Sequence, residues 1–226
     1  MDFQFLNLNK FPKDNDFLID IINQLPHTTR AIEVGAYIGR FTKLILEQFE
    51  NALIIEGEET NYKNLLTTFP QYKTKIINHV VYNDNNEHDW YYANEDWGNA
   101  LIMPLDESRT KHMTKTKVKS VTLDSIDFNF DFIKTDCEGA DLKILMGAKR
   151  LIKKNRPLIY FEHSGEIGAS IHNYTEDTFF NFFKKLDYTL FLANGEKFLS
   201  STWRIDTKKE FDSCNILAIP NQKLDT

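Results

Sequence analysis

A short apolar run that ends in an acid and enters a glycine-bracketed turn is the feature that most constrains this chain. The run is AIEV at residues 31–34, and the turn GAYIG at 35–39 leads directly into an amphipathic helical pattern. A buried parallel strand would carry Glu33 to the carboxyl edge of a sheet, where open α/β folds place their ligands. Gly35 and Gly39 have no Cβ, so the backbone can turn sharply and lie close to a bound molecule. The stretch therefore predicts a nucleotide-cofactor loop.

The glycine spacing argues against a dinucleotide. In the G-x-G-x-x-G fingerprint of dinucleotide-binding folds, the second and third glycines would fall on Tyr37 and Arg40 of this chain. A side chain at position 37 blocks the close approach of a pyrophosphate. The spacing G-x-x-x-G thus favours another ligand.

Strand and helix patterns alternate along the rest of the chain. Apolar runs predict strands at 52–55, 75–82, 130–136 and 157–162, and helical periods predict helices at 14–25, 41–49, 62–69, 142–152 and 175–186. A final pair of strands, 188–193 and 214–219, follows a last helix and is interrupted by an Asn194-Gly195 turn. We expect an α/β fold with an open, mostly parallel sheet, an antiparallel last strand and helices on both faces.

Acids stand where three of the predicted strands end. Glu33 ends the first strand, Glu56 follows the second and Asp136 ends the fourth. Right-handed crossovers bring these strand ends to one crevice. We therefore expect the three carboxylates to meet there.

The chain is long enough for a single domain over residues 1–226, and its hydrophobic fraction of 42% supports a buried core. The polar segment 83–117 shows no sustained period and contains Trp90 and Trp97, so we expect a hairpin and long loop there rather than core. The basic run KHMTKTKVK at 111–119 is either a solvated loop or edge strand, or a docking patch for a phosphate-bearing acceptor.

Composition excludes several classes of protein. The net charge of -6 gives no general attraction to nucleic acid. Cys137 and Cys214 match no C-x-x-C pattern, which leaves a zinc cluster or disulfide framework without support. No apolar segment approaches the roughly 18 residues of a spanning helix, so we expect a cytoplasmic protein without a membrane span. Nothing in the sequence predicts an oligomeric state.

The chain resembles the FkbM family of S-adenosylmethionine-dependent methyltransferases from Ala31 to Glu162. The resemblance rests on EVGAYIGRFT, LIIEGEETNYKNL, VTLDSI, DFIKTDCEGADLKILMGA and PLIYFE, which follow the family's order. The run containing TDCEGAD is the most specific, because the family's pattern is approximately K-x-D-x-E-G-x-E. This chain departs from the family at Asp141, where Glu is usual, and at Gly57, where proline is frequent.

The resemblance implies a class I methyltransferase fold of Rossmann-like type, with S-adenosyl-L-methionine as cofactor. It implies transfer of a methyl group to a hydroxyl oxygen of a sugar, a glycan or a glycosylated natural product. The residues that it assigns to the cofactor are Glu33 near the amino group, Gly35 and Gly39 around the methionine part, Glu56 on both ribose hydroxyls, Gly57 and Val80 at the adenosine side, and Asp136 under the methionine end or beside the acceptor.

A sugar hydroxyl is a poor nucleophile, so a general base should take its proton as the new bond forms. Asp136, Glu138 and His163 are the candidates, because all three follow strands that end at the same edge. We favour Asp136 or His163, since Glu138 has a competing role as an acceptor of backbone N–H groups at the next helix start. As an alternative, the three residues hold a divalent cation that positions a diol, although we predict no metal.

Two rival functions stay open. An NAD-dependent oxidoreductase needs the same acid on the ribose but also a glycine where Tyr37 stands. A catalytically inactive cofactor-binding subunit of a partner enzyme would keep the cofactor pocket, and the intact TDCEGAD cluster argues against that reading.

Overall fold

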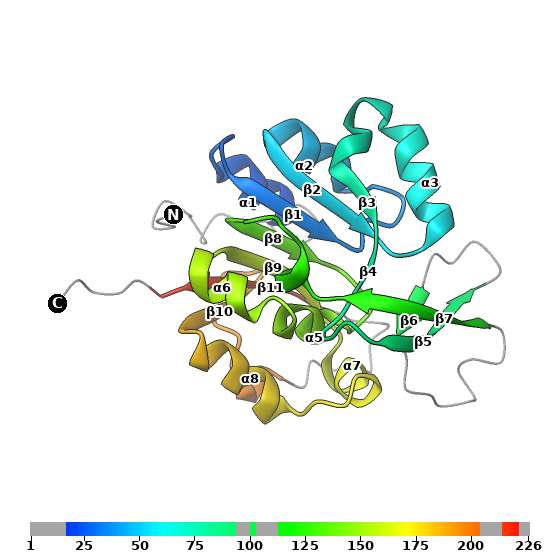
Figure 1. Cartoon of the computed structure of the whole chain (residues 1–226). Helices are drawn as coiled ribbons and strands as arrows, with labels where there is room; N and C mark the ends of the chain where they lie inside the picture. The colour runs from blue at the N-terminus through cyan, green and yellow to red at the C-terminus, as the bar shows by residue number, and fades with distance from the viewer. Residues whose placement is uncertain (1–16, 94–99, 103–112, 204–213, 222–226) are drawn as a thin grey trace.

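Apolar strand segments build a central seven-stranded sheet. The computed structural model describes residues 17–93, 100–102, 113–203 and 214–221. The order of strands in the sheet is β10-β11-β9-β8-β1-β2-β3 (Figure 1). Their bounds are β1 Arg30–Val34, β2 Asn51–Glu56, β3 Ile76–Asn78, β8 Phe132–Thr135, β9 Leu158–His163, β10 Tyr188–Leu192 and β11 Cys214–Pro220.

The direction of the strands confirms the predicted fold class. From β9 across to β3, every neighbouring pair in this sheet is parallel. The last strand, β11, runs antiparallel to both of its neighbours, β9 and β10. The result is an open, mostly parallel sheet with an antiparallel last strand, as the alternation of strand and helix patterns predicts.

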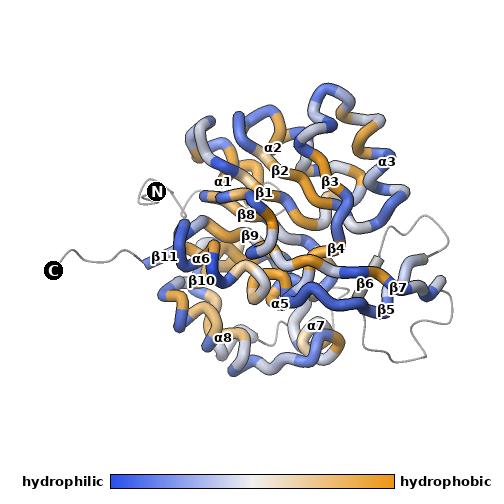
Figure 2. Tube along the Cα trace, in the orientation of Figure 1, coloured by the Kyte–Doolittle hydropathy of each residue, from blue (hydrophilic) through white to orange (hydrophobic). Residues whose placement is uncertain are grey.

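Helices cover both faces of this sheet because successive strand residues point to opposite sides. On β1, Ala31 belongs to one buried apolar cluster and Ile32 to the other. One cluster is closed by α1 (Phe17–Gln24), α2 (Thr42–Gln48) and α3 (Glu59–Thr68), and the other by α5 (Asp141–Met146), α6 (Lys149–Asn155) and α8 (Glu176–Lys185). Figure 2 shows apolar residues gathered in the central strands and polar residues on the outer faces of the helices.

Shorter helical elements join these layers. Helix α7 (Gly165–Ile171) follows β9, and short 3-10 helices lie at Pro70–Lys75, Leu123–Ser125 and Ser200–Thr202. Thr175 caps α8, because its side chain accepts from the backbone N–H of Thr178. Within the ranges given above, no helix has both the length and the apolar content that crossing a membrane requires.

The single strand predicted at 75–82 is wrong, because the chain changes sheets in the middle of it. β3 pairs with β2 in the large sheet, whereas β4 (Val80–Val81) pairs with β7 in a second sheet. His79 lies at the crossing, where its N–H donates to the Glu56 carbonyl at 3.2 Å. An apolar pattern marks burial and carries no information on which sheet the strand joins.

The segment predicted as hairpin and long loop contains more structure than expected. β5 (Glu87–Ala93), β6 (Ala100–Ile102) and β7 (Met113–Val121) join β4 in a four-stranded sheet of order β4-β7-β5-β6. Tyr91 on β5 is buried, so the expectation that nothing here belongs to a core is wrong. Trp97 and Lys111 lie outside the described residues.

The basic run does not form an edge strand. β7, which carries most of it, lies between β4 and β5. Its Lys115 and Lys117 side chains approach the Asp89 carboxylate on β5 at 2.9 and 2.7 Å. The charge of the run is thus partly balanced by a cross-strand acid.

The long helix predicted over 142–152 is two helices. The chain bends between α5 and α6 at Gly147, whose carbonyl accepts from the N–H of Asp124 at 2.9 Å. A Cβ at position 147 would lie 2.3 Å from the Tyr82 carbonyl oxygen. The close approach of a distant backbone therefore requires the glycine, and a helical period in the sequence does not reveal it.

Candidate functional site

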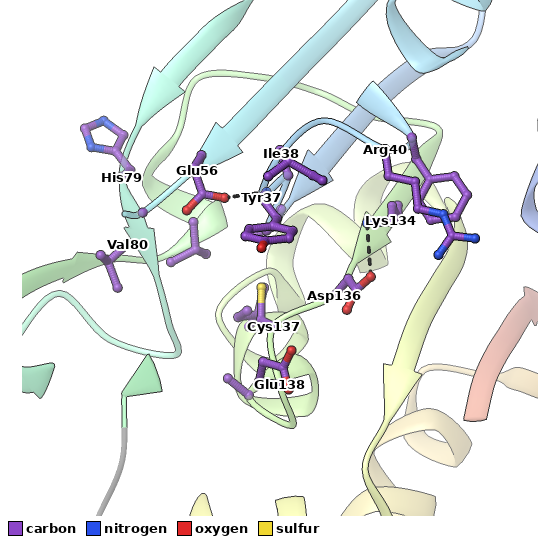
Figure 3. A pocket seen from close by; sticks show the side chains of 18 of the residues that line it. Tyr37, Ile38, Arg40, Glu56, His79, Val80, Lys134, Asp136, Cys137 and Glu138 are labelled. Atoms are coloured by element: carbon purple, nitrogen blue, oxygen red, sulfur yellow. Dashed lines mark hydrogen bonds and ion pairs between the residues drawn. The ribbon is translucent and has the colours of Figure 1, made fainter. Parts of the chain in front are cut away.

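A pocket opens at the carboxyl edge of β1, β2 and β8. Its volume is about 420 Å³, within the range of small-molecule and cofactor sites. The residues that line it come from the turn after β1, from the end of β2, from the crossing between the two sheets and from the turn after β8 (Figure 3). Of the residues predicted for the site, those in the lining are Gly35, Glu56, Gly57, Val80, Asp136 and Glu138.

The turn after β1 is built from left-handed backbone at alternate residues. The φ angles are +78° at Gly35, +52° at Tyr37 and +87° at Gly39. A Cβ at position 35 would lie 2.1 Å from the Asp136 carbonyl oxygen, and one at position 39 would lie 2.7 Å from the Phe69 ring. The glycines therefore let the turn pack closely against neighbouring protein, and Gly35 also lines the pocket.

Glu56 fastens this turn to the end of β2. One carboxylate oxygen accepts from the N–H of Tyr37 at 2.7 Å, and the other accepts from the N–H of Glu58 at 2.8 Å. Burial raises the pKa of Glu56 more than these hydrogen bonds lower it. Each oxygen of a carboxylate accepts more than one hydrogen bond, so this group can also take the hydroxyls of a diol in the pocket.

The backbone beside Glu56 forms another wall of the pocket. Gly57, His79 and Val80 line the pocket there. Asn78 braces this wall, because its side-chain amide donates to the carbonyls of Glu56 at 2.8 Å and Gly57 at 3.1 Å. Val80, which the family resemblance assigns to the adenosine side, thus lines the pocket together with Glu56 and Gly57.

Glu33 lies behind the pocket and not in its lining. It is fully buried, and its carboxylate accepts from the Thr42 hydroxyl at 2.7 Å and lies 3.2 Å from the Lys134 ammonium. Burial raises the pKa of Glu33, and the charge of Lys134 opposes that shift. Lys134 therefore lies at the position beside Glu33 where the resemblance places the amino group of a cofactor.

Lys134 pairs with two of the acids, Glu33 and Asp136. Its ammonium also lies 3.4 Å from the Asp136 carboxylate, although the lysine side chain is only 3% exposed. Burial alone would lower the pKa of Lys134, but the charges of Glu33 and Asp136 outweigh it and raise that pKa. Lys134 lines the pocket beside Arg40. The one sequence signal for this group is a cation inside the otherwise apolar strand segment of DFIKTD, and the acids at the strand ends alone do not predict its role.

Asp136 and Glu138 face the pocket from the turn after β8. The Asp136 side chain is 41% exposed. Glu138 adopts a left-handed φ of +53°, and partial burial followed by the charge of Asp136 raises the pKa of its carboxyl. The structural role expected for Glu138 belongs instead to Asp141, whose carboxylate accepts from the Cys137 N–H at 3.4 Å.

The structure does not bring His163 into the pocket. His163 is the last residue of β9, is 1% exposed, and lies with its ring centre 4.5 Å from that of Trp203 and 5.0 Å from that of Phe179. The alternation of β9 turns it toward α8 along with Phe161. A general base must reach the proton that it removes, so this burial argues against His163 in that role. Burial also lowers the pKa of His163 to about 4.

The same placement bears on the alternative in which Asp136, Glu138 and His163 hold a divalent cation. His163 is separated from the two acids by its burial under α8. Nowhere in the described part of the chain do three or more His, Cys, Asp or Glu side chains cluster as metal ligands would.

A family model described as "Methyltransferase FkbM domain" matches residues 33–195. No curated protein sequence matches the chain. An S-adenosylmethionine-dependent methyltransferase from Clostridium acetobutylicum ATCC 824 has a similar fold, with a TM-score of 0.52 at 10% identity over 92% of this chain and 90% of that one.

Two further structures are similar at lower TM-scores. Methyltransferase FkbM from Methylobacillus flagellatus KT gives 0.49 at 18% identity over 84% of this chain, which spans only 44% of that protein. An O-methyltransferase from Bacillus cereus in complex with SAH gives 0.45 at 11% identity, over 96% of this chain and 84% of that one.

The buried Glu33–Lys134 pair yields a stability prediction. Lys134→Met should lower the free energy of unfolding by about 3–5 kcal/mol, because it leaves Glu33 buried without a counter-charge. The double substitution Glu33→Gln with Lys134→Met should recover most of the loss. Urea denaturation of both variants measures this, with Lys43→Met, which removes an exposed partner of Glu47 at 3.9 Å, as a neutral control. A Lys134→Met variant as stable as the parent would contradict the prediction.

His163 yields a prediction on pH. The unfolded chain binds a proton at His163 below about pH 6.5, whereas the folded chain does so only near pH 4. Protonation therefore favours the unfolded chain, and the contribution of His163 to the free energy of unfolding is lost as the pH falls between these values. The cost of His163→Leu should therefore shrink by about 2 kcal/mol between pH 7 and pH 4.5.

Denaturation of parent and variant at each pH measures that difference directly. Comparing the two proteins cancels opposing groups such as Asp141, whose pKa burial raises to about 7. The control is Phe198→Leu, which removes a ring in contact with His163 but no titrating group. A cost of His163→Leu that stays constant with pH, like that of the control, would show that His163 is not held neutral.

Proposed function

The chain belongs to the FkbM methyltransferase family, and from that premise we propose that it is an S-adenosylmethionine-dependent O-methyltransferase. Its acceptor in this proposal is a hydroxyl of a sugar, a glycan or a glycosylated natural product. One observation carries the proposal: the pocket contains carboxylates in two different settings. Glu56 is held by backbone N–H groups, whereas Asp136 and Glu138 lie at the open side of the pocket.

The pocket fits the cofactor in its donor chemistry. Glu56 offers acceptor-only oxygens for a ribose diol. Toward the other end of the pocket, Arg40 and Lys134 are cations that suit an α-carboxylate, and Asp136 is an anion that suits an ammonium. The lining also includes Ala36, Ala140 and Ile144, which suit the uncharged parts of such a molecule. Glu33 then contributes indirectly, by holding Lys134.

When bound, S-adenosylmethionine supplies an electrophilic methyl group on a sulfonium. The protein's part is to hold the acceptor oxygen close and in line, and to remove its proton. In place of Asp136 or His163, which the sequence favours, we propose Glu138 as the base, because it lines the pocket while Asp136 is paired with Lys134 and His163 is buried outside the pocket. Its raised pKa also makes it a stronger proton acceptor than an ordinary carboxylate. Asp136 is already engaged by Lys134 and acts on Glu138 through its charge.

Both rival functions fit these residues less well. An NAD-dependent oxidoreductase needs a glycine where Tyr37 stands, and here Tyr37 lines the pocket at a left-handed φ. An inactive partner subunit has no need of two carboxylates facing the open side of the pocket.

Cofactor binding is the first test. Calorimetry should show that the chain binds S-adenosylmethionine and its demethylated product, S-adenosylhomocysteine, but not NAD. Glu56→Gln should weaken binding of the product about 10- to 100-fold, because hydrogen bonds to a charged group contribute about 1.5–3 kcal/mol. Glu58→Gln is the matched control, since Glu58 caps α3 outside the pocket. If neither methionine cofactor binds, the proposed function fails.

The base is tested by pH-dependent turnover on an acceptor found by screening sugars with labelled cofactor. Glu138→Gln should lower kcat by about 10²- to 10⁴-fold while the affinity for S-adenosylhomocysteine stays unchanged. In the parent, kcat should rise with pH as Glu138 loses its proton. Asp136→Asn should move that rise to lower pH, because it removes the charge that raises the Glu138 pKa. A rise that survives in Glu138→Gln would assign the base elsewhere.

A further inference from the structure

The space beside Gly57 is filled by a tryptophan from the second sheet. A Cβ at position 57 would lie 3.4 Å from Cη2 of Trp90 and 3.0 Å from Cγ2 of Val80. The φ angle of Gly57 is not in the left-handed region, so the backbone itself does not demand glycine there. A Cβ there would be crowded by the Val80 methyl, whereas it would lie at van der Waals distance from the tip of the Trp90 ring.

Trp90 reaches this place because of the way β5 is oriented. Asp89 and Tyr91 on one face of β5 approach the lysines of β7. Trp90 and Tyr92 share the other face, since side chains alternate along a strand. The Trp90 ring packs against the core cluster under the large sheet and also lines the pocket. The second sheet therefore contributes to the pocket wall through Trp90 on β5 as well as through Val80 and Val81 on β4.

The position of Trp90 within the pocket indicates which part of a ligand it faces. Gly57 directly follows Glu56, the carboxylate suited to a ribose diol, and Val80 follows His79 on the same side. Figure 3 shows Glu56, His79 and Val80 together at one end and Arg40 and Lys134 at the other, with Asp136 near them. The base of a nucleoside held at Glu56 lies next to its ribose, and an aromatic face is what binds a planar base by stacking.

We infer, on the basis of the proposed function, that Trp90, whose ring lines the pocket beside Gly57, forms the aromatic wall of the adenine subsite. The insertion between the third and fourth strands of the large sheet then contributes directly to cofactor binding. This assigns to Trp90 a role distinct from anchoring its own segment or holding an acceptor sugar.

The experiment compares Trp90→Ala and Trp90→Phe with Tyr92→Ala, a matched loss of an aromatic ring from the same face of β5 but outside the pocket lining. Calorimetry measures the affinity for S-adenosylhomocysteine and for adenosine. Trp90→Ala should raise both dissociation constants by a similar factor, about 5- to 150-fold, because stacking of one base contributes about 1–3 kcal/mol. Trp90→Phe keeps an aromatic face and should lose much less, and Tyr92→Ala should lose nothing.

A second readout does not depend on the alanine variant folding. Adenosine should quench the tryptophan fluorescence of the parent, and the quench should be absent in Trp90→Phe, although the two other tryptophans of the sequence remain.

The outcomes separate this inference from the proposed function. If the parent binds S-adenosylhomocysteine but the Trp90 variants bind it equally well and show the same quench, the inference is wrong and the proposed function stands. If Trp90→Ala weakens S-adenosylhomocysteine but not adenosine, the ring acts on the amino-acid end and the inference is also wrong. If the parent binds neither, the proposed function fails first.

Discussion

The ion pair between the buried Lys134 ammonium and Glu33 is the interaction on which the rest of the site depends. Lys134 on β8 is the register partner of Glu33 on β1, so the ion pair at 3.2 Å is a cross-strand pair in the middle of the sheet. A slip of one residue between these strands would leave both charges buried and unpaired, at a cost of several kcal/mol. The pair therefore helps to specify the alignment of β1 with β8. That alignment sets Val34 level with Thr135, and the turns that follow the two strands meet as a result.

The contact between these turns explains the chemistry of the pocket edge. Gly35 lies against the backbone of Asp136, and Tyr37 donates its N–H to Glu56 on the next strand. Three strand ends are thereby fixed to one another. The carboxylates on them differ in burial: Glu33 is fully enclosed, Glu56 is mostly so, and Asp136 is open to the pocket. Glu33 and Asp136 both pair with Lys134, but only the Asp136 carboxylate of these two is also exposed in the pocket, where a ligand can reach it.

The sequence predicts the features that arise from local pattern. The apolar runs that end in acids gave the large sheet and the convergence of Glu33, Glu56 and Asp136 at one edge. The sequence does not predict features that depend on contacts between distant segments. The bend at Gly147 exists because the Tyr82 carbonyl approaches there, and the two-sheet crossing at His79 leaves no mark in an apolar run. A predicted strand that ends at residue 162 puts His163 in the loop at the sheet edge, whereas β9 includes His163 and its side chain lies under α8.

The two sheets carry different parts of the site. β3 passes into β4 through the single residue His79, so the second sheet begins at the pocket wall itself. The charged groups that suit a ribose and an amino acid stand on the large sheet and are fixed by its register. Trp90 instead depends on the pairing of β5 with β6 and β7. A change in the second sheet would therefore alter the wall beside Gly57 while leaving Lys134 and its two acids in place. The electrostatic part of the site and its aromatic part are thus held by different sets of hydrogen bonds.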